Sequence, residues 1–243
     1  MDTLTAPPST PPSTEIPMSD LHFDLDTTPL RDVNSVLHGD VSGEVVIDNP
    51  HGAHSVAAGV NAPVKITVNG HVGYYAAGMN QQAEIIINGN AGTGVAENMM
   101  SGTVVVKGNA SQSAGATAHG GLLVIEGDAA ARCGISMKGV DIVVGGNVGH
   151  NSAFMAQAGR MVVRGDAGQG LGDSIYETRL YVRGSVASLG ADCIVKPMRA
   201  EHLEELAGLL KAAGFKDDDP TKYTRYGSAR ELYHFHVDNS SAY

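Results

Sequence analysis

The chain has 243 residues, a net charge of −10, 31 glycines and no tryptophan. The acidic balance argues against a general nucleic-acid surface, which needs a basic patch. The sequence contains no apolar run long enough to span a bilayer, and its glycine content is well above the usual share of about 7%.

Residues 1–20 form a tail rich in proline, serine and threonine. The tail has neither the basic n-region nor the apolar h-region of a secretory signal, so we expect a cytoplasmic protein. Its composition predicts disorder up to about Asp20.

From Lys65 to Gly184 the sequence repeats every 19 residues without an insertion or deletion. Each unit is a short strand closed by glycine: KITVNG (65–70), EIIING (84–89), TVVVKG (103–108), LLVIEG (122–127), DIVVGG (141–146), RMVVRG (160–165) and RLYVRG (179–184). One strand per period of about 20 residues is typical of a solenoid. Because such a unit is too short to add a crossover helix, we predict an all-β fold, a single-stranded parallel right-handed β-helix with two or three short strands in each turn.

Two positions of the repeat are aliphatic in every unit and share one face of the strand, because side chains alternate along a strand. The second position is Ile66, Ile85, Val104, Leu123, Ile142, Met161 and Leu180, and the fourth is Val68, Ile87, Val106, Ile125, Val144, Val163 and Val182. We predict that both columns point into the core.

The middle column faces outward and yet is largely apolar: Thr67, Ile86, Val105, Val124, Val143, Val162 and Tyr181. An apolar strip on an outer face indicates a surface that something covers. The alternative is that the strip reflects only the β-propensity of a buried parallel sheet.

Two further columns predict tight bends. The glycine that ends each strand is followed mostly by asparagine or aspartate, which tolerate positive φ and whose side chains bond nearby backbone. A later column contains only Ala77, Ala96, Gly115, Gly134, Ala153 and Gly172, which indicates a tight corner or a narrow interior. Upstream, residues 44–47 followed by Gly52 and Gly59 are expected to form a less regular first rung.

The C-terminal part leaves the repeat. Apolar residues at helical spacing predict a helix over 199–214 that caps the last rung. The tail that follows carries Tyr223, Tyr226, Tyr233 and Tyr243 together with Arg230. Tyrosine and arginine are favoured at interfaces, so the tail either docks a partner, which we favour, or packs on its own subunit. We therefore divide the chain into the tail 1–20, a β-helix domain 21–195, and a helix with a docking tail 196–243.

Residues that carry chemistry are scarce. His51 with His54, and His234 with His236, have the spacing of metal ligands but no third ligand at a recognisable distance along the chain. The turns GGNVG (145–149) and GDAGQG (165–170) resemble phosphate loops, but each leads to another strand rather than to a helix. Cys133 and Cys193 form no pattern, and Cys133 is expected to be a reduced core residue. We predict no catalytic, cofactor-binding or metal-binding residue in this chain.

The glycine units resemble the GXGXG β-helix domain at the C-terminal end of the glutamate synthase large subunit. ENMMSG (97–102) and AHGG (118–121) are similar to the turns that precede strands in that domain. Five motifs are similar to the stand-alone form of the domain, which is a separate β-helix subunit of N-methylglutamate synthase: GYYAAGMN (73–80), VAENMMSG (95–102), RCGISMKG (132–139), SLGADC (188–193) and RYGSAR (225–230). The resemblance covers residues 21–243 and leaves the N-terminal tail unexplained.

The resemblance implies a scaffold subunit without its own active site. Two partner subunits would be expected, one like a glutamine amidotransferase and one an FMN-binding synthase with an iron–sulfur cluster. The reaction of that family joins methylamine to L-glutamate, giving N-methyl-L-glutamate and ammonia. The alternative is the scaffold subunit of formylmethanofuran dehydrogenase or of the related formyltransferase/hydrolase complex, which shares the domain. A secreted β-helix enzyme acting on polysaccharide is disfavoured, because the outer columns mix charges of both signs and no signal peptide is expected.

Overall fold

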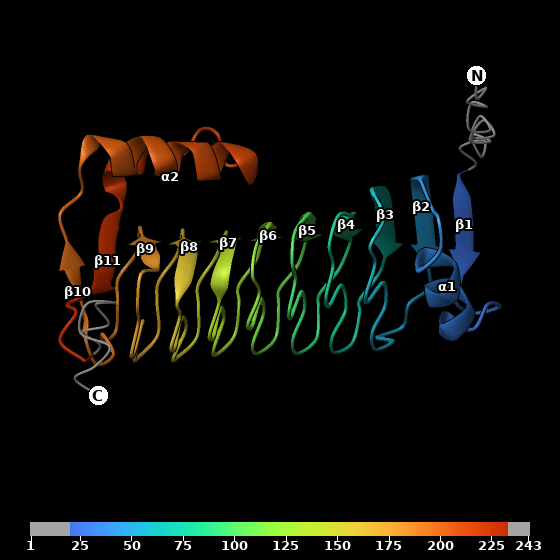
Figure 1. Cartoon of the computed structure of the whole chain (residues 1–243), viewed down its shortest axis with the longest axis horizontal. Coiled ribbons are helices and arrows are strands. Elements are labelled where there is room, and N and C mark those ends of the chain that lie inside the picture. Colours follow the sequence, from blue (N-terminus) through green and yellow to red (C-terminus); the bar gives the residue numbers. More distant parts are fainter. Residues whose placement is uncertain (1–19, 233–243) are drawn as a thin grey trace, which may run out of the picture.

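The computed structural model describes residues 20–232, which form an elongated β-solenoid (Figure 1). In that part of the chain a single sheet runs along the molecule in the order β1-β2-β3-β4-β5-β6-β7-β8-β9-β11-β10. The parallel strands are β1 (Leu21–Asp24), β2 (Gly43–Asp48), β3 (Val64–Asn69), β4 (Glu84–Ile87), β5 (Thr103–Val106), β6 (Leu122–Ile125), β7 (Lys138–Val144), β8 (Ala158–Val163) and β9 (Arg179–Val182). The predicted parallel β-helix is confirmed.

The strands pair in the register that the repeat predicts, with each residue opposite its counterpart in the next turn, such as Ile85 opposite Val104 and Val104 opposite Leu123. Both aliphatic columns are buried, so the predicted core is confirmed. From β3 onwards each turn holds one regular strand followed by an isolated bridge, such as Ala91 to Ala110. The second strand of each turn is therefore reduced to a single bridging residue.

The N-terminal rungs are more regular than expected. β2 pairs with β3 along its whole length, and β1 adds a further parallel rung before it. Helix α1 (Leu30–Leu37) lies between these two strands in the sequence and buries Val33 and Leu37 in the solenoid core. The 19-residue period did not reveal β1 because this helix interrupts it.

The corner opposite the sheet uses left-handed backbone at alternate positions. In the turn after β5, Ser113, Gly115 and Thr117 have φ values of 60°, 65° and 54°, and the central position belongs to the column of alanine and glycine. A Cβ on Gly115 would lie 2.8 Å from Ile142 Cδ1 and 3.0 Å from Leu123 Cδ2. The column is therefore both a tight corner and part of a narrow interior.

The asparagines and aspartates after each strand act differently from the prediction. None of them has positive φ, and their side chains bond the next turn rather than local backbone. Asn109 Oδ1, for example, accepts a hydrogen bond from the Asp128 backbone N–H at 2.8 Å. The same bond recurs from turn to turn at His71, Asn90, Asn109, Asp128, Asn147 and Asp166. This ladder holds one edge of the stack in register.

The C-terminal part contains β10 (Cys193–Lys196), helix α2 (Ala200–Ala212), a short 3-10 helix (Pro220–Lys222) and β11 (Thr224–Ser228). The helix predicted over 199–214 is present, but the expectation that it caps the last rung is wrong, because its leucines pack on the outer residues of the sheet. It lies along the outer face of the sheet (Figure 1), whereas β11 continues the sheet by pairing antiparallel with both β9 and β10. The end of the solenoid is thus extended by strands.

The tail is only partly free to dock a partner. Tyr223 and Tyr226, which we expected to contact a partner, are 5% and 9% exposed and pack on their own chain. Their assignment as docking anchors is wrong, because β11 carries this segment into the sheet. Tyr233 and Tyr243 lie outside the described residues. Within residues 20–232 no helix is long and apolar enough to cross a membrane.

Replacing Gly115 with valine tests the register of the stack. Overpacking should lower the free energy of unfolding by about 1–3 kcal/mol, with added strain because φ is positive. Gly208→Ala is the control, since nothing lies within 4 Å of a Cβ there and alanine favours the helix. An unchanged melting temperature for Gly115→Val would contradict the register.

Candidate functional site

The outer face of the sheet is divided into two halves. On β6 to β9 the outward-pointing residues are at most 2% exposed: Val124, Val143, Val162 and Tyr181. On β2 to β5 their counterparts are only partly buried: Val46, Thr67, Ile86 and Val105. Helix α2 lies over β7 to β9 and does not extend over β2 to β5 (Figure 1). We call Val46, Thr67, Ile86 and Val105 the open strip.

The covered half is a second hydrophobic cluster. Leu206, Leu209 and Leu210 of α2 pack with the outer residues of the sheet, and Tyr223 belongs to the same cluster. The leucines recur at helical spacing because α2 presents one apolar face to the sheet. The prediction that something covers the apolar strip is therefore confirmed for this half, and the cover is the chain's own helix.

Glu205 joins the middle of α2 to the sheet. It accepts a hydrogen bond from the Tyr181 hydroxyl at 2.5 Å and lies 2.9 Å from Arg179 and 3.3 Å from Arg160. Arg160 in turn makes two contacts with Asp141, at 2.6 and 2.5 Å. Burial, followed by the bond to Glu205, raises the pKa of Tyr181, so this phenol stays protonated and acts as a donor.

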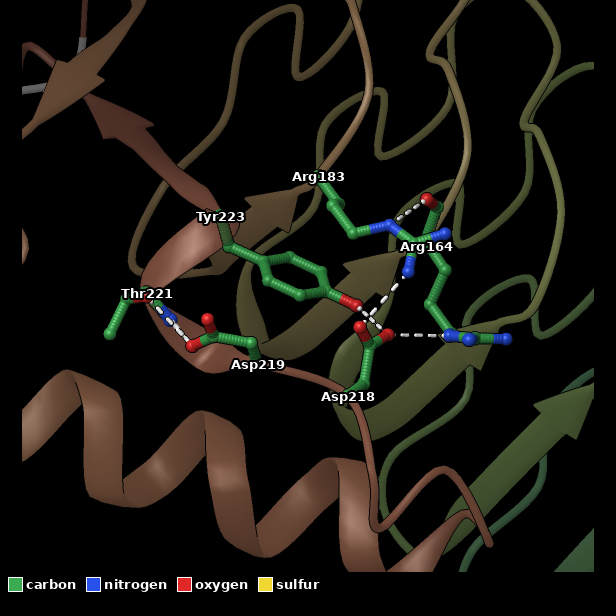
Figure 2. Close-up of polar contacts among 6 residues, drawn as sticks. All are labelled: Arg164, Arg183, Asp218, Asp219, Thr221 and Tyr223. Atoms are coloured by element: carbon green, nitrogen blue, oxygen red, sulfur yellow. Dashed lines mark hydrogen bonds and ion pairs between the residues drawn. The ribbon is translucent and has the colours of Figure 1, made fainter.

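Asp218 anchors the segment that follows α2 (Figure 2). Its carboxylate accepts hydrogen bonds from Arg164 Nε at 2.6 Å, from Arg183 at 2.9 Å and from the Tyr223 hydroxyl at 2.8 Å. Arg164 also stacks over the Phe215 ring, with 4.1 Å from its guanidinium carbon to the ring centre. Burial acts to raise the pKa of Asp218, but the three hydrogen bonds outweigh it and hold that pKa at about 2.

Replacing Asp218 with asparagine should release this segment from the sheet. Loss of charge-assisted hydrogen bonds is expected to lower the free energy of unfolding by about 1–3 kcal/mol. Because the folded pKa lies below the usual 3.8, the carboxylate stabilises the fold above about pH 4 and loses this effect as the pH falls towards 2. The matched control is Asp217→Asn, which removes the same charge from an exposed neighbour. Acid unfolding of both variants is monitored by circular dichroism. If the two variants unfold over the same pH range, the assignment of Asp218 as the anchoring carboxylate is wrong.

A separate feature lies at the C-terminal end of the solenoid. A cavity of about 320 Å³ is lined by segments that precede β9, end β10, begin α2 and form β11. Its basic lining residues are Arg179, Lys196, Arg199, Arg225 and Arg230. Sequence analysis missed this cluster because its members come from different segments and the chain as a whole is acidic. The frequency of arginine after residue 179 is the feature of the sequence that could have indicated this cluster.

The histidine pairs do not form a metal centre in the described structure. His51 Nε2 lies 2.9 Å from Asp26, and His54 stacks on Tyr74 with 3.8 Å between ring centres. Within residues 20–232 no group of three or more histidine, cysteine or acidic side chains is placed to hold a metal ion. His234 and His236 lie outside the described residues.

The cysteines and glycine turns have structural roles. Cys133 is fully buried, and burial raises the pKa of its thiol to about 12, which confirms it as a core residue. The thiol pKa of Cys193 is likewise raised to about 12 by burial. The turns at 145–149 and 165–170 lie between strands or bridges of successive rungs, and no helix begins after them. Neither turn has the geometry of a phosphate loop.

Comparison with known proteins gives one informative relative. Protein GlxC of Rhizobium meliloti (strain 1021) is 61% identical over 227 residues, which cover 91% of this chain and 99% of that protein. No family model and no solved structure matches the chain. Since the similarity spans nearly the whole of both proteins, the chain belongs to the GlxC family.

Proposed function

We propose that this chain is the scaffold subunit of a glutamate-synthase-like enzyme complex of the N-methylglutamate synthase type. The complex would join methylamine to L-glutamate and release ammonia. Support comes from the GXGXG-type repeat and from the five motifs that resemble the stand-alone β-helix subunit of that enzyme. Membership of the GlxC family is compatible with this proposal.

The open strip is the observation that best supports a scaffold role. It continues the apolar column that α2 covers on β7 to β9, and it lies on a parallel sheet. Its borders are polar: Lys65 pairs with Glu44 at 3.0 Å, and Glu84 is exposed beside Ile86. An apolar centre with a polar rim is the usual anatomy of a protein interface.

The partners would carry the chemistry. An amidotransferase-like subunit would release or transfer the amino group, and an FMN-binding subunit with an iron–sulfur cluster would supply the redox steps. Two ion-paired carboxylates, Glu205 and Asp218, hold α2 and the segment that follows it on the sheet. We therefore assign it no catalytic residue and no cofactor of its own.

Reconstitution tests the division of labour. The isolated chain should show a strand-dominated circular dichroism spectrum and no turnover of methylamine with L-glutamate. Turnover should require both partner subunits, and the assembled complex should show the visible spectrum of a flavin. Turnover by the purified chain alone would exclude a scaffold role. Co-purification with a metal-dependent amidohydrolase-like subunit instead would favour the formylmethanofuran dehydrogenase type.

A charge placed in the open strip tests the interface. Val105→Glu should weaken association with a partner subunit at least tenfold, because a carboxylate would be buried in an apolar contact. Gln112→Glu is the matched control, since it adds the same charge to an exposed position of the same turn. Association is measured by co-purification, and melting curves check that both variants fold.

Full-strength assembly of the Val105→Glu variant would place the interface elsewhere. Residues 233–243 would then be the next segment to remove. A cut at residue 223 is unsuitable, because it deletes β11 and with it the pairing to β9 and β10.

A further inference from the structure

The cavity at the C-terminal end concentrates positive charge on an acidic protein. Five of its lining residues are basic, whereas Glu177 is its one acidic lining residue in the described chain. Those five are drawn from the 16 lysines and arginines of a chain with a net charge of −10. Clustering of this kind lowers stability through repulsion unless something negative compensates it.

Neighbouring acids compensate only part of this charge. Arg230 pairs with Glu177 at 2.8 Å, Arg179 pairs with Glu205, and Arg199 lies 3.7 Å from Glu201. Within residues 20–232, Lys196 and Arg225 have no carboxylate partner. Arg225 uses one guanidinium nitrogen to bond the Pro197 carbonyl at 3.2 Å.

Buried donors without partners converge on the same place. In the described residues, three buried side-chain nitrogen or oxygen atoms lack a hydrogen-bond partner: Thr178 Oγ1, Arg179 Nε and Arg225 Nε. All three residues line this cavity. Thr178 is only 2% exposed, so its hydroxyl is not satisfied by bulk water. Unpartnered buried donors are costly, and their coincidence in one cavity indicates a ligand that accepts from them.

The first turn of α2 adds to the positive potential. Arg199 and His202 line the cavity, and the Arg199 backbone N–H donates to His202 Nδ1 at 3.2 Å. Burial, and then the charge of Arg225, lower the pKa of His202, so this imidazole is neutral near pH 7. A helix as long as α2 favours an anion near its N-terminus, and that end of α2 lines the cavity.

We propose that this cavity binds the oxyanion group, a carboxylate or a phosphate, of a small metabolite. Guanidinium groups match either oxyanion through paired donors, and Lys196 adds a point charge. The cavity volume falls within the range of small-molecule sites. The proposal stands apart from the scaffold role, because it rests on the end of the solenoid and not on the open strip.

Titration calorimetry on the full chain tests the proposal with inorganic phosphate and with succinate, at constant ionic strength. We expect saturable binding of at least one probe to a single site. Preference for phosphate would assign a phosphoryl ligand, and preference for succinate would assign a carboxylate ligand. Absence of saturable binding for both probes would overturn the proposal.

Two variants separate a built site from general surface charge. Thr178→Val keeps shape and charge but removes the hydroxyl, and it should weaken binding about fivefold while the melting temperature without ligand stays equal or rises. Lys196→Gln should weaken binding about tenfold. The control is Lys138→Gln, an exposed lysine on β7 outside the cavity, which should bind as the parent does. Equal affinity in all four proteins would mean that only general charge attracts the anion, and the proposal would fail.

Discussion

The structure depends on the stacking of identical turns at hydrogen-bonding distance. Each residue of a strand lies opposite its counterpart one turn later. Across the narrow interior the opposite corner faces the strand side chains, so a Cβ on Gly115 would lie within 3.0 Å of Leu123 and Ile142. The large aliphatic side chains of the strands fill the interior of each turn, which explains why the opposite corner admits only alanine or glycine. The hydrogen bonds from asparagine and aspartate side chains to the next turn reinforce the same spacing at the edge.

In a stack of this kind, the outer face of the sheet and the last turn have no neighbouring turn to cover them. The C-terminal segment of the chain covers part of each. α2 covers the outer face over β7 to β9 and is held there by leucine packing and by the Glu205 and Asp218 networks. β11 pairs with the last parallel strand. The cover is incomplete, since the open strip continues the same apolar column beyond the helix. The folding of this segment back along the solenoid thus determines which part of the outer face is covered and which part, the open strip, is not.

The same return of the chain creates the basic cavity. Its lining comes from the turn before β9, the end of β10, the start of α2 and β11, which meet only because β11 runs antiparallel beside β9. The regular rungs satisfy their polar groups by repetition, whereas this irregular end contains the buried donors without partners. In the described chain, this solenoid therefore has its unpartnered buried polar groups at the irregular end and not in the repetitive body.

The sequence by itself determined the parallel β-helix, the identity of both core columns, the helix near residues 199–214 and the burial of Cys133. A fixed period places residues of one repeat position in the same surroundings in every turn. The residue types found at that position therefore show whether it is buried in the core. Only the tertiary structure decided what covers Val143 and Val162, why Tyr223 and Tyr226 are buried, and that Thr178, Arg179 and Arg225 share a cavity. These features depend on contacts between segments with no common period, and such contacts follow from how the C-terminal segment packs against the finished stack, which no local pattern encodes.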